Sequence, residues 1–394
     1  MVLLVAVAGC ATISQKDDLI PMFWPDPPEK TRIKYVRSIR SRDDVGWPSV
    51  LEVVVGRNKQ IALLQPMGLA VSEDGQRIYV ADFAWNAVFV FDLQARESRI
   101  IGEGKYPLDR PIGVALDGLE NVYITDTGSR SVRVYDKNGK FLRGVGQRLL
   151  VRPTGVAIDK MRQHLYVVDT GHNDEQAHQV KVFDLEGKLI RQIGRRGEGD
   201  GEFKFPTFAA VNAQGNLYVV DSANFRIQVF DPDGKFLRKF GRTGNKIGDF
   251  ARPKAAALDS FGNIYVVDSQ WSNIQIFNQK GELLLIFGGV GFYPGLLFNP
   301  SAIAIDKENT IYVSDSFGRR ISIYQLINTT AEDSWGAEEF DNTKGGVTKA
   351  EGKRLEASEI AAVKTKGGVT EREDKKLEAS KVAEVKTKKG GESK

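Results

Sequence analysis

Short stretches in which apolar and polar residues alternate run through the chain from about residue 64 to residue 324. Each stretch is bounded by Gly, Asp, Asn or Pro, as in Leu217–Ser222 (LYVVDS) and Arg226–Asp231 (RIQVFD). Alternation with a period of two, interrupted by turn residues, predicts β-strands joined by tight turns. This part of the chain is therefore expected to be all-β.

The same pattern recurs six times. Each copy has a proline that opens one apolar stretch and an aspartate that closes the next. The prolines are Pro66, Pro111, Pro153, Pro206, Pro253 and Pro300, and the aspartates are Asp82, Asp126, Asp169, Asp221, Asp268 and Asp315. Successive prolines are 42 to 53 residues apart. Four strands in a repeat of this length are typical of a β-propeller blade, so the chain is predicted to form six blades.

The two ends of the array complement each other. The sixth copy supplies three strands, the last at Arg320–Tyr324, and then runs into polar sequence. Near the N-terminus, Thr31–Ile39 has the pattern of a fourth strand but lacks three strands to accompany it. Because closing the ring removes exposed sheet edges, we expect this N-terminal strand to complete the last blade.

The motif at Asp221–Phe230 (DSANFRIQVF), preceded by Pro206 and by Leu217–Val220, resembles NHL repeats. The resemblance covers about residues 64 to 324. It implies a six-bladed propeller used mostly for binding, although some relatives are enzymes. Among these are amidating lyases, which rely on a zinc centre whose histidines are spread over several blades. Fold alone does not establish function.

The first nine residues are apolar and end in small residues before the only cysteine, Cys10. They resemble a bacterial lipoprotein signal, with Val7–Cys10 (VAGC) in the place of the lipobox. The resemblance implies a signal peptide at residues 1–10, a lipid on Cys10 and a tether at 11–30. The next two residues are Ala11 and Thr12. In bacterial lipoproteins, residues of this kind after the cysteine are associated with sorting to the outer membrane. The alternative is an apolar N-terminus with an incidental cysteine.

The propeller is expected to span residues 31–326, and residues 327–394 have a different composition. This last part is rich in charged residues and contains a 22-residue tandem repeat, which begins at Thr343 and again at Thr365 with the sequence TKGGVT. Such a sequence has too little apolar surface to offset the entropy lost on ordering. It is predicted to be a disordered tail.

Charge and cysteine content narrow the functional classes. The 55 basic and 51 acidic residues leave a net charge of +4, which gives no global indication of nucleic-acid binding. RNA binding, known for some eukaryotic relatives, also conflicts with an exported lipoprotein. One cysteine cannot form an intrachain disulfide. We expect a monomeric propeller that is attached to the membrane through its lipid and does not bind nucleic acid.

The loops between second and third strands, and those leading into first strands, are expected to share one face around the central channel. Interleaved Arg and aromatic side chains there suit carboxylates, sugars and other planar or anionic groups. The predicted binding residues are Trp85, Arg130, Phe225, Arg226, Trp271, Arg319 and Arg320. The alternative for Arg226 and Arg320, which occupy the same repeat position, is that each packs its stem and pairs with a local aspartate.

Metal chemistry has one candidate segment. The third blade carries a loop insertion relative to its sister loops, in which His172, Asp174, Glu175 and His178 could converge on zinc or calcium. The alternative is a solvated loop. The six repeated aspartates are interpreted as structural instead, since a turn must be built six times whereas a catalytic group is needed once. Sequence motifs for nucleophilic catalysis or a phosphate-binding loop are absent.

The sequence thus predicts a non-enzymatic binding or scaffolding lipoprotein of the bacterial cell envelope, anchored in the outer membrane. Its Arg and aromatic face would bind an envelope protein or a glycan, and no cofactor is expected. The alternative is a metal-dependent lyase or hydrolase that acts at the mouth of the channel, as in the amidating lyases.

Overall fold

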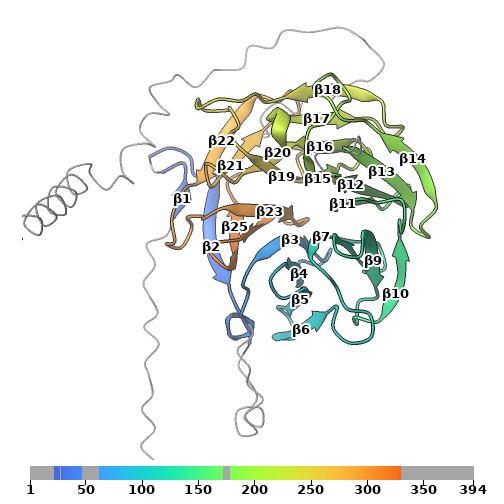
Figure 1. Ribbon diagram of the computed structural model, residues 1–394. Helices are drawn as coiled ribbons and strands as arrows, with labels where there is room; N and C mark the ends of the chain where they lie inside the picture. Colours follow the sequence, from blue (N-terminus) through green and yellow to red (C-terminus); the bar gives the residue numbers. More distant parts are fainter. Residues whose placement is uncertain (1–21, 27, 47–61, 172–177, 330–394) are drawn as a thin grey trace, which may run out of the picture. The chain divides into compact units, whose positions relative to one another are not determined.

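The computed structural model describes residues 22–26, 28–46, 62–171 and 178–329. These residues form six antiparallel sheets arranged in a ring, shown in Figure 1. Among them, helical structure is limited to two short 3-10 turns, η1 (Arg42–Asp44) and η2 (Ser222–Asn224). The predicted all-β propeller with six blades is confirmed.

Blades 1 to 5 are built from consecutive strands, numbered along the chain from the channel outwards. Blade 1 contains β3 (Pro66–Val71), β4 (Arg77–Asp82), β5 (Ala87–Asp92) and β6 (Glu97–Ile101). Blade 2 contains β7 (Pro111–Leu116), β8 (Val122–Asp126), β9 (Ser131–Tyr135) and β10 (Phe141–Val145). Blade 3 contains β11 (Pro153–Asp159), β12 (His164–Asp169), β13 (Gln179–Asp184) and β14 (Leu189–Ile193).

The next two blades follow the same order. Blade 4 contains β15 (Pro206–Val211), β16 (Leu217–Asp221), β17 (Arg226–Phe230) and β18 (Phe236–Phe240). Blade 5 contains β19 (Pro253–Leu258), β20 (Ile264–Asp268), β21 (Asn273–Phe277) and β22 (Leu283–Gly288). In all six blades the first strand begins at the repeated proline and the second ends at the repeated aspartate.

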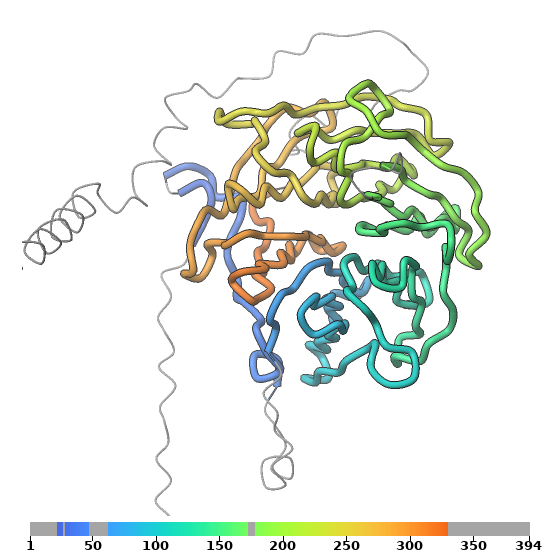
Figure 2. Tube along the Cα trace, in the orientation of Figure 1, coloured from blue at the N-terminus to red at the C-terminus, as the bar shows by residue number. Residues whose placement is uncertain are grey.

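Blade 6 contains both ends of the described chain. It consists of β23 (Pro300–Ile305), β24 (Thr310–Asp315), β25 (Arg320–Leu326), β2 (Ile33–Ile39) and β1 (Phe23–Trp24). Strand β2 pairs with β25, which confirms the predicted closure, and Figure 2 shows the blue N-terminal segment beside the orange C-terminal one. Strand β1 was not predicted: two residues of the range assigned to the tether add a fifth strand outside β2.

Aromatic packing holds the N-terminal strands in place. The ring of Trp24 lies 5.8 Å from that of Tyr324 and 6.0 Å from that of Phe287, in the outer strand of blade 5. The ring of Tyr35 lies 5.6 Å from that of Tyr324. Such edge-on pairs contribute about 0.5–1.5 kcal/mol beyond the area they bury. The closure therefore combines backbone pairing with a local aromatic cluster.

The hydrophobic core is divided into six layers, one between each pair of neighbouring blades. The layer between blades 5 and 6, for example, includes Tyr265, Ile311 and Tyr324, all fully buried. Because alternating side chains of each sheet enter the layers on its two sides, every blade depends on both neighbours for burial of apolar area.

Small residues let the first strands converge around the channel. A Cβ atom at Gly113 would lie 2.6 Å from the carbonyl oxygen of Thr154, and one at Gly68 would lie 2.4 Å from that of Ile112. Glycine is required at these two positions because neighbouring strands approach closely there.

Several sequence predictions concern residues outside the described ranges. These are Cys10 with its signal segment, the tail from residue 330 onward, and His172, Asp174 and Glu175. A helix long and apolar enough to span a bilayer does not occur in the described ranges.

Candidate functional site

The repeated aspartates define one face of the ring. Each accepts backbone N–H bonds from the loop that leads into the first strand of its blade. Asp126 Oδ2 is 2.9 Å from Asp109 N, and Asp315 Oδ1 is 2.7 Å from Phe298 N. The loop that follows the second strand and the loop that precedes the first are thus tied together on the same side. We call this side the loop face.

These aspartates have a structural role. Asp82 Oδ1 also accepts bonds from Ala84 N and Trp85 N, at 3.1 and 3.2 Å, and its side chain is fully buried. Burial raises the pKa of the Asp82 carboxyl, and the backbone N–H bonds that it accepts oppose this effect. All six aspartates are 0% exposed, so none offers an oxygen to a ligand on the surface.

Two of the predicted binding residues are buried. Arg226 is 6% exposed: its Nε lies 2.8 Å from Asp221 Oδ2, and its Nη2 lies 2.9 Å from the carbonyl oxygen of Glu202. Arg320 is 1% exposed and bonds in the same way to Asp315 Oδ2, at 2.9 Å, and to loop carbonyl oxygens. Their prediction as ligand-binding groups must be corrected to the structural alternative, because protein oxygens occupy both guanidinium groups.

The other predicted residues are more accessible and are spread around the ring. Trp85 in blade 1 and Trp271 in blade 5 are 44% and 40% exposed. Arg130 in blade 2 and Arg319 in blade 6 are exposed, each with a φ of 51° at the end of the loop before the third strand. Phe225 in blade 4 shares this left-handed conformation but is half-buried and packs on the core layer between blades 4 and 5.

Exposed arginines are the main chemical feature of the loop face. Five are exposed and have no ion pair with any residue that the structure describes: Arg130, Arg148, Arg152, Arg252 and Arg319. Other arginines of this face are neutralised locally, such as Arg195 by Glu202 and Arg242 by Asp249. Free guanidinium groups bind carboxylates, sulfates and phosphates through paired N–H bonds. The loop face is therefore suited to an anionic partner.

Sequence reasoning missed a group of exposed apolar residues on the same face. Val290, Phe292 and Tyr293, in the loop that leads into blade 6, are 64%, 63% and 78% exposed. Phe317, in the loop after β24, is 55% exposed. Aligning the Gly-rich loops that precede blades 4, 5 and 6 would have revealed the first three, because the other two loops have no apolar side chain larger than glycine at the same positions.

The predicted metal site is only partly described. His178 is fully buried, with its Nδ1 3.3 Å from both the carbonyl oxygen of Phe203 and the backbone nitrogen of Phe205. Burial lowers the pKa of His178, so the imidazole is neutral. Its predicted co-ligands lie outside the described residues. Within the described ranges, no group of three or more His, Cys, Asp or Glu side chains could hold a metal ion.

Lys254 is the most perturbed cation near the channel. It is the second residue of β19, half-buried, and Thr207 of the neighbouring first strand donates a hydrogen bond to its carbonyl oxygen at 2.6 Å. Burial, together with the nearby charge of Arg252, lowers its pKa to about 8. Its ammonium group forms no ion pair with a described residue.

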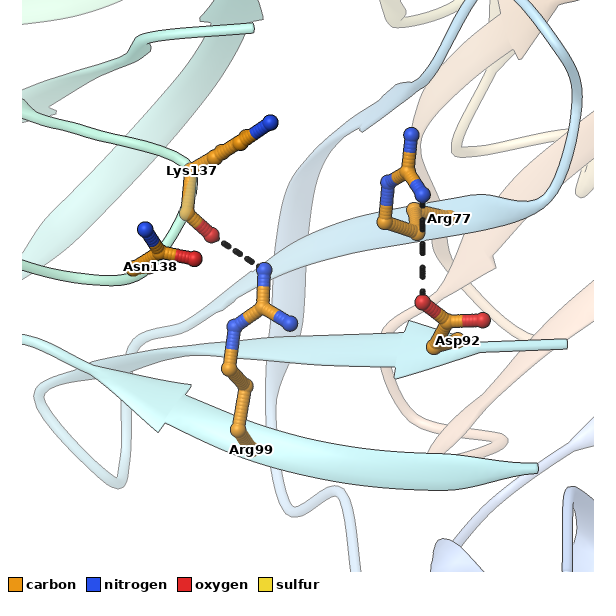
Figure 3. A pocket seen from close by; sticks show the side chains of 5 residues that line it. All are labelled: Arg77, Asp92, Arg99, Lys137 and Asn138. Atoms are coloured by element: carbon orange, nitrogen blue, oxygen red, sulfur yellow. Dashed lines mark hydrogen bonds and ion pairs between the residues drawn. The ribbon is translucent and has the colours of Figure 1, made fainter. Parts of the chain in front are cut away.

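A pocket of about 170 Å³ lies away from the loop face, between blades 1 and 2. Figure 3 shows its lining side chains, with Arg99 reaching the carbonyl oxygen of Lys137 and Arg77 facing Asp92 at 3.9 Å. Arg77 also binds Glu120, with a distance of 2.6 Å from Nε to Oε1. Since hydrogen bonds and ion pairs join side chains of the two blades across this pocket, it is a junction between blades.

Comparison with known proteins agrees with the fold. The family model described as NHL repeat matches residues 203–230, which include the first three strands of blade 4. A search of curated sequences found no match. The chain therefore carries an NHL repeat within a six-bladed propeller, which confirms the predicted resemblance.

Solved structures with the same fold differ widely in sequence. A streptogramin B lyase is 14% identical with a TM-score of 0.52, and the alignment covers 68% of this chain and 95% of the lyase. An auxiliary nutrient binding protein from Bacteroides thetaiotaomicron is 13% identical with a TM-score of 0.53, with coverages of 66% and 69%. A protein of unknown function from the same organism is 18% identical with a TM-score of 0.53, with coverages of 67% and 70%. These similarities establish the fold.

Proposed function

We propose that this protein is a non-enzymatic binding propeller of the bacterial cell envelope, anchored in the outer membrane through a lipid on Cys10. Its loop face binds an anionic partner, either an envelope protein or an acidic glycan. This proposal rests on the set of exposed arginines that lack ion pairs with described residues. Each leaves bidentate donors directed to solvent, and several together make a surface that selects negative charge.

Blades 2 and 3 are the proposed centre of this surface. Arg130 follows the second strand of blade 2, and Arg148 and Arg152 lie in the loop that leads into blade 3. All three are exposed and unpaired among the described residues. The loop that leads into blade 3 is tied to the second strand of that blade, where Asp169 accepts bonds from Val151 N and Arg152 N at 3.1 and 2.7 Å. The backbone that carries two of the arginines is therefore fixed before a partner binds.

Charge reversal tests the binding surface. The variant Arg130→Glu, Arg148→Glu, Arg152→Glu should lose a partner that the wild-type protein recovers from detergent-solubilised envelopes. The matched control makes the same charge change at exposed positions in hairpins on the opposite side of blades 2, 3 and 4. Its substitutions are Lys140→Glu, Lys188→Glu and Lys235→Glu. The control should retain the partner. If both triple variants retain it, or both lose it, the loop face is not the binding surface.

Fractionation tests the anchor separately. Cys10→Ser removes the only thiol of the chain, so it should move the protein from the membrane fraction to the soluble fraction. A protein that stays membrane-bound and carries no lipid by mass spectrometry would contradict the proposed anchor.

The alternative function is a metal-dependent lyase or hydrolase at the channel mouth. The shared fold with a streptogramin B lyase does not distinguish it from binding, because a nutrient binding protein has the same fold. Elemental analysis distinguishes the two. Stoichiometric zinc or calcium that is lost on His172→Ala and His178→Ala would replace the binding proposal with the enzymatic one.

A further inference from the structure

Three of the loops that lead into first strands have the same backbone. They span residues 194–203, 241–250 and 288–297, before blades 4, 5 and 6. In each, the third and tenth residues form a parallel bridge: Arg196 with Phe203, Thr243 with Phe250, and Val290 with Leu297. In each, the eighth residue is a glycine with positive φ, between 77° and 85°. The three loops are therefore matched copies.

The chemistry of the third copy differs from that of the other two. Its second and ninth residues are Gly289 and Leu296, where the first two loops have ion pairs of 2.8 Å (Arg195 with Glu202) and 2.6 Å (Arg242 with Asp249). Its third, fifth and sixth residues are Val290, Phe292 and Tyr293, where the second loop has Thr243, Asn245 and Lys246. Because the polar copies close in the same way, the loop does not need aromatic residues in order to fold.

The exposed apolar residues form one surface. The ring of Phe298 lies 4.6 Å from that of Phe292 and 5.6 Å from that of Phe317. Together, Val290, Phe292, Tyr293, Phe298 and Phe317 are called the blade-6 patch. Buried Arg320 fixes its backbone by donating to the carbonyl oxygen of Phe292 at 2.9 Å. A rigid, contiguous apolar surface on a protein of this kind marks an interaction site.

The position of the N-terminal segment indicates what covers the patch. A Cβ atom at Gly295, in the same loop, would lie 2.6 Å from Met22 Sδ and 3.2 Å from the Trp24 ring. The described N-terminal segment, which contains β1 in Figure 1, therefore begins directly beside the loop that carries the patch. Cys10 precedes Met22 by only 12 residues, which span roughly 40 Å when extended.

We propose that the blade-6 patch is a membrane-contact surface, whose aromatic side chains insert among the lipid headgroups of the bilayer that holds Cys10. This inference rests on the proposed lipid anchor, which would bring bilayer and patch together. Aromatic rings are favoured at the headgroup level. The exposed Arg319 beside the patch, which has no ion pair with a described residue, would attract anionic lipids. The patch lies at blade 6 and the proposed partner surface at blades 2 and 3, so the two occupy different blades of the loop face.

The single cysteine makes the contact directly measurable. In a full-length Cys10→Ser chain, Tyr293→Cys creates the only thiol, which is labelled with an environment-sensitive fluorophore. With vesicles of phosphatidylcholine and phosphatidylglycerol at 3:1, we expect emission to rise at least twofold and to be quenched by headgroup-level spin-labelled lipid. The control label at Leu119→Cys, which is 80% exposed in the first turn of blade 2 on the opposite side, should not respond. Equal responses at the two positions would overturn the proposal.

A sister-loop exchange tests the contribution of the aromatic residues. Val290→Thr with Phe292→Asn installs the residues of loop 241–250 without adding charge, so folding should be retained, and a thermal melt checks this. Vesicle affinity should fall at least tenfold, whereas Leu119→Thr with Met161→Asn should leave it unchanged. If the sister-loop variant binds vesicles with wild-type affinity, the proposal is overturned. It is also overturned if the fluorophore at position 293 responds to a protein extract but not to vesicles. Because this chain carries no lipid, failure here is distinguishable from failure of the Cys10 anchor.

Discussion

Arg319 and Arg320 are adjacent at the start of β25 and have opposite surroundings. Arg320 is 1% exposed and pairs with buried Asp315, whereas Arg319 is exposed. We expect Arg320→Ala to lower the free energy of unfolding by about 3–5 kcal/mol, because it leaves Asp315 as an uncompensated buried charge. Arg319→Ala should change it by less than about 0.5 kcal/mol. Denaturant unfolding of both variants measures the difference, and similar losses would contradict the assigned roles.

Lys254 makes stability depend on pH. Its pKa of about 8 in the folded protein is below the ordinary lysine value of 10.5, so between these pH values the unfolded chain binds more protons. Stability from this group therefore rises as the pH increases from 8 to 10.5. Lys254→Met should be more stable than the wild type at pH 7 by roughly 2–3 kcal/mol.

Urea unfolding at pH 7, 9 and 10.5 follows this difference, which should shrink as the pH rises. The exposed Lys235→Met is the control and should give a small difference that does not vary with pH. A constant advantage of Lys254→Met across the series would show that burial does not perturb the Lys254 ammonium group.

For individual residues, the sequence could identify which ones lie in the loops, but it could not predict which of their side chains are buried. Arg226 and Arg320 occupy the same slot of the repeat, and the loops that lead into blades 4 and 6 cover both of them through carbonyl oxygens of Glu202 and Leu296. Burial here depends on a loop about 24 residues earlier in the chain, as the bonded pairs show. Alternation within a strand carries no information about that distant contact.

Arginines in the outermost strands link consecutive blades. The third residue of the fourth strand in blades 1 to 4 is an arginine: Arg99, Arg143, Arg191 and Arg238. Each bonds to the first turn residue of the next blade's last hairpin, as with Arg191 Nη1, 3.1 Å from the carbonyl oxygen of Pro232. In blade 5 this position is Leu285, which packs against the same core layer as Met22 and Trp24 of the closing blade. The polar link is replaced by apolar packing where that hairpin is missing.

Removing one link tests its contribution. Arg191→Met keeps the aliphatic stem but loses the bond to Pro232, so the free energy of unfolding should fall by about 1–2 kcal/mol. Gln192→Met at the exposed neighbouring position should have an effect below about 0.5 kcal/mol. Thermal and denaturant unfolding measure both. An Arg191→Met protein as stable as the wild type would show that the link does not stabilise the junction.

The strands themselves were largely predictable from sequence. Repeated prolines and aspartates fixed the start of the first strand and the end of the second, because a proline without an N–H suits a strand terminus and aspartate accepts loop N–H bonds. Strand β1 was not predictable in this way, since Phe23 and Trp24 are too few to show alternation. Their place is set by the aromatic cluster of Tyr324 and Phe287, which exists only after the ring closes.

Closure of the ring should dominate the stability of the whole molecule. A chain that lacks residues 1–40 loses β1 and β2 and leaves β25 as an exposed edge, so it should unfold at lower denaturant concentration and self-associate. A chain that lacks only residues 1–21 keeps both strands and is the matched control. A synthetic peptide of residues 22–40 should bind the shorter chain and restore its unfolding midpoint. If both truncated chains behave alike, β2 is not required for closure.

Blade 6 also sets a temporal order for biosynthesis. Ser38 in β2 and Ser322 in β25 are neighbours in one sheet but 284 residues apart in the chain. Ribosomes produce β2 first, so it remains without its hydrogen-bonding partner until nearly all of the propeller has been made. The unpaired strand Ile33–Ile39 is therefore exposed during synthesis, and chaperones that recognise extended segments have a natural target there.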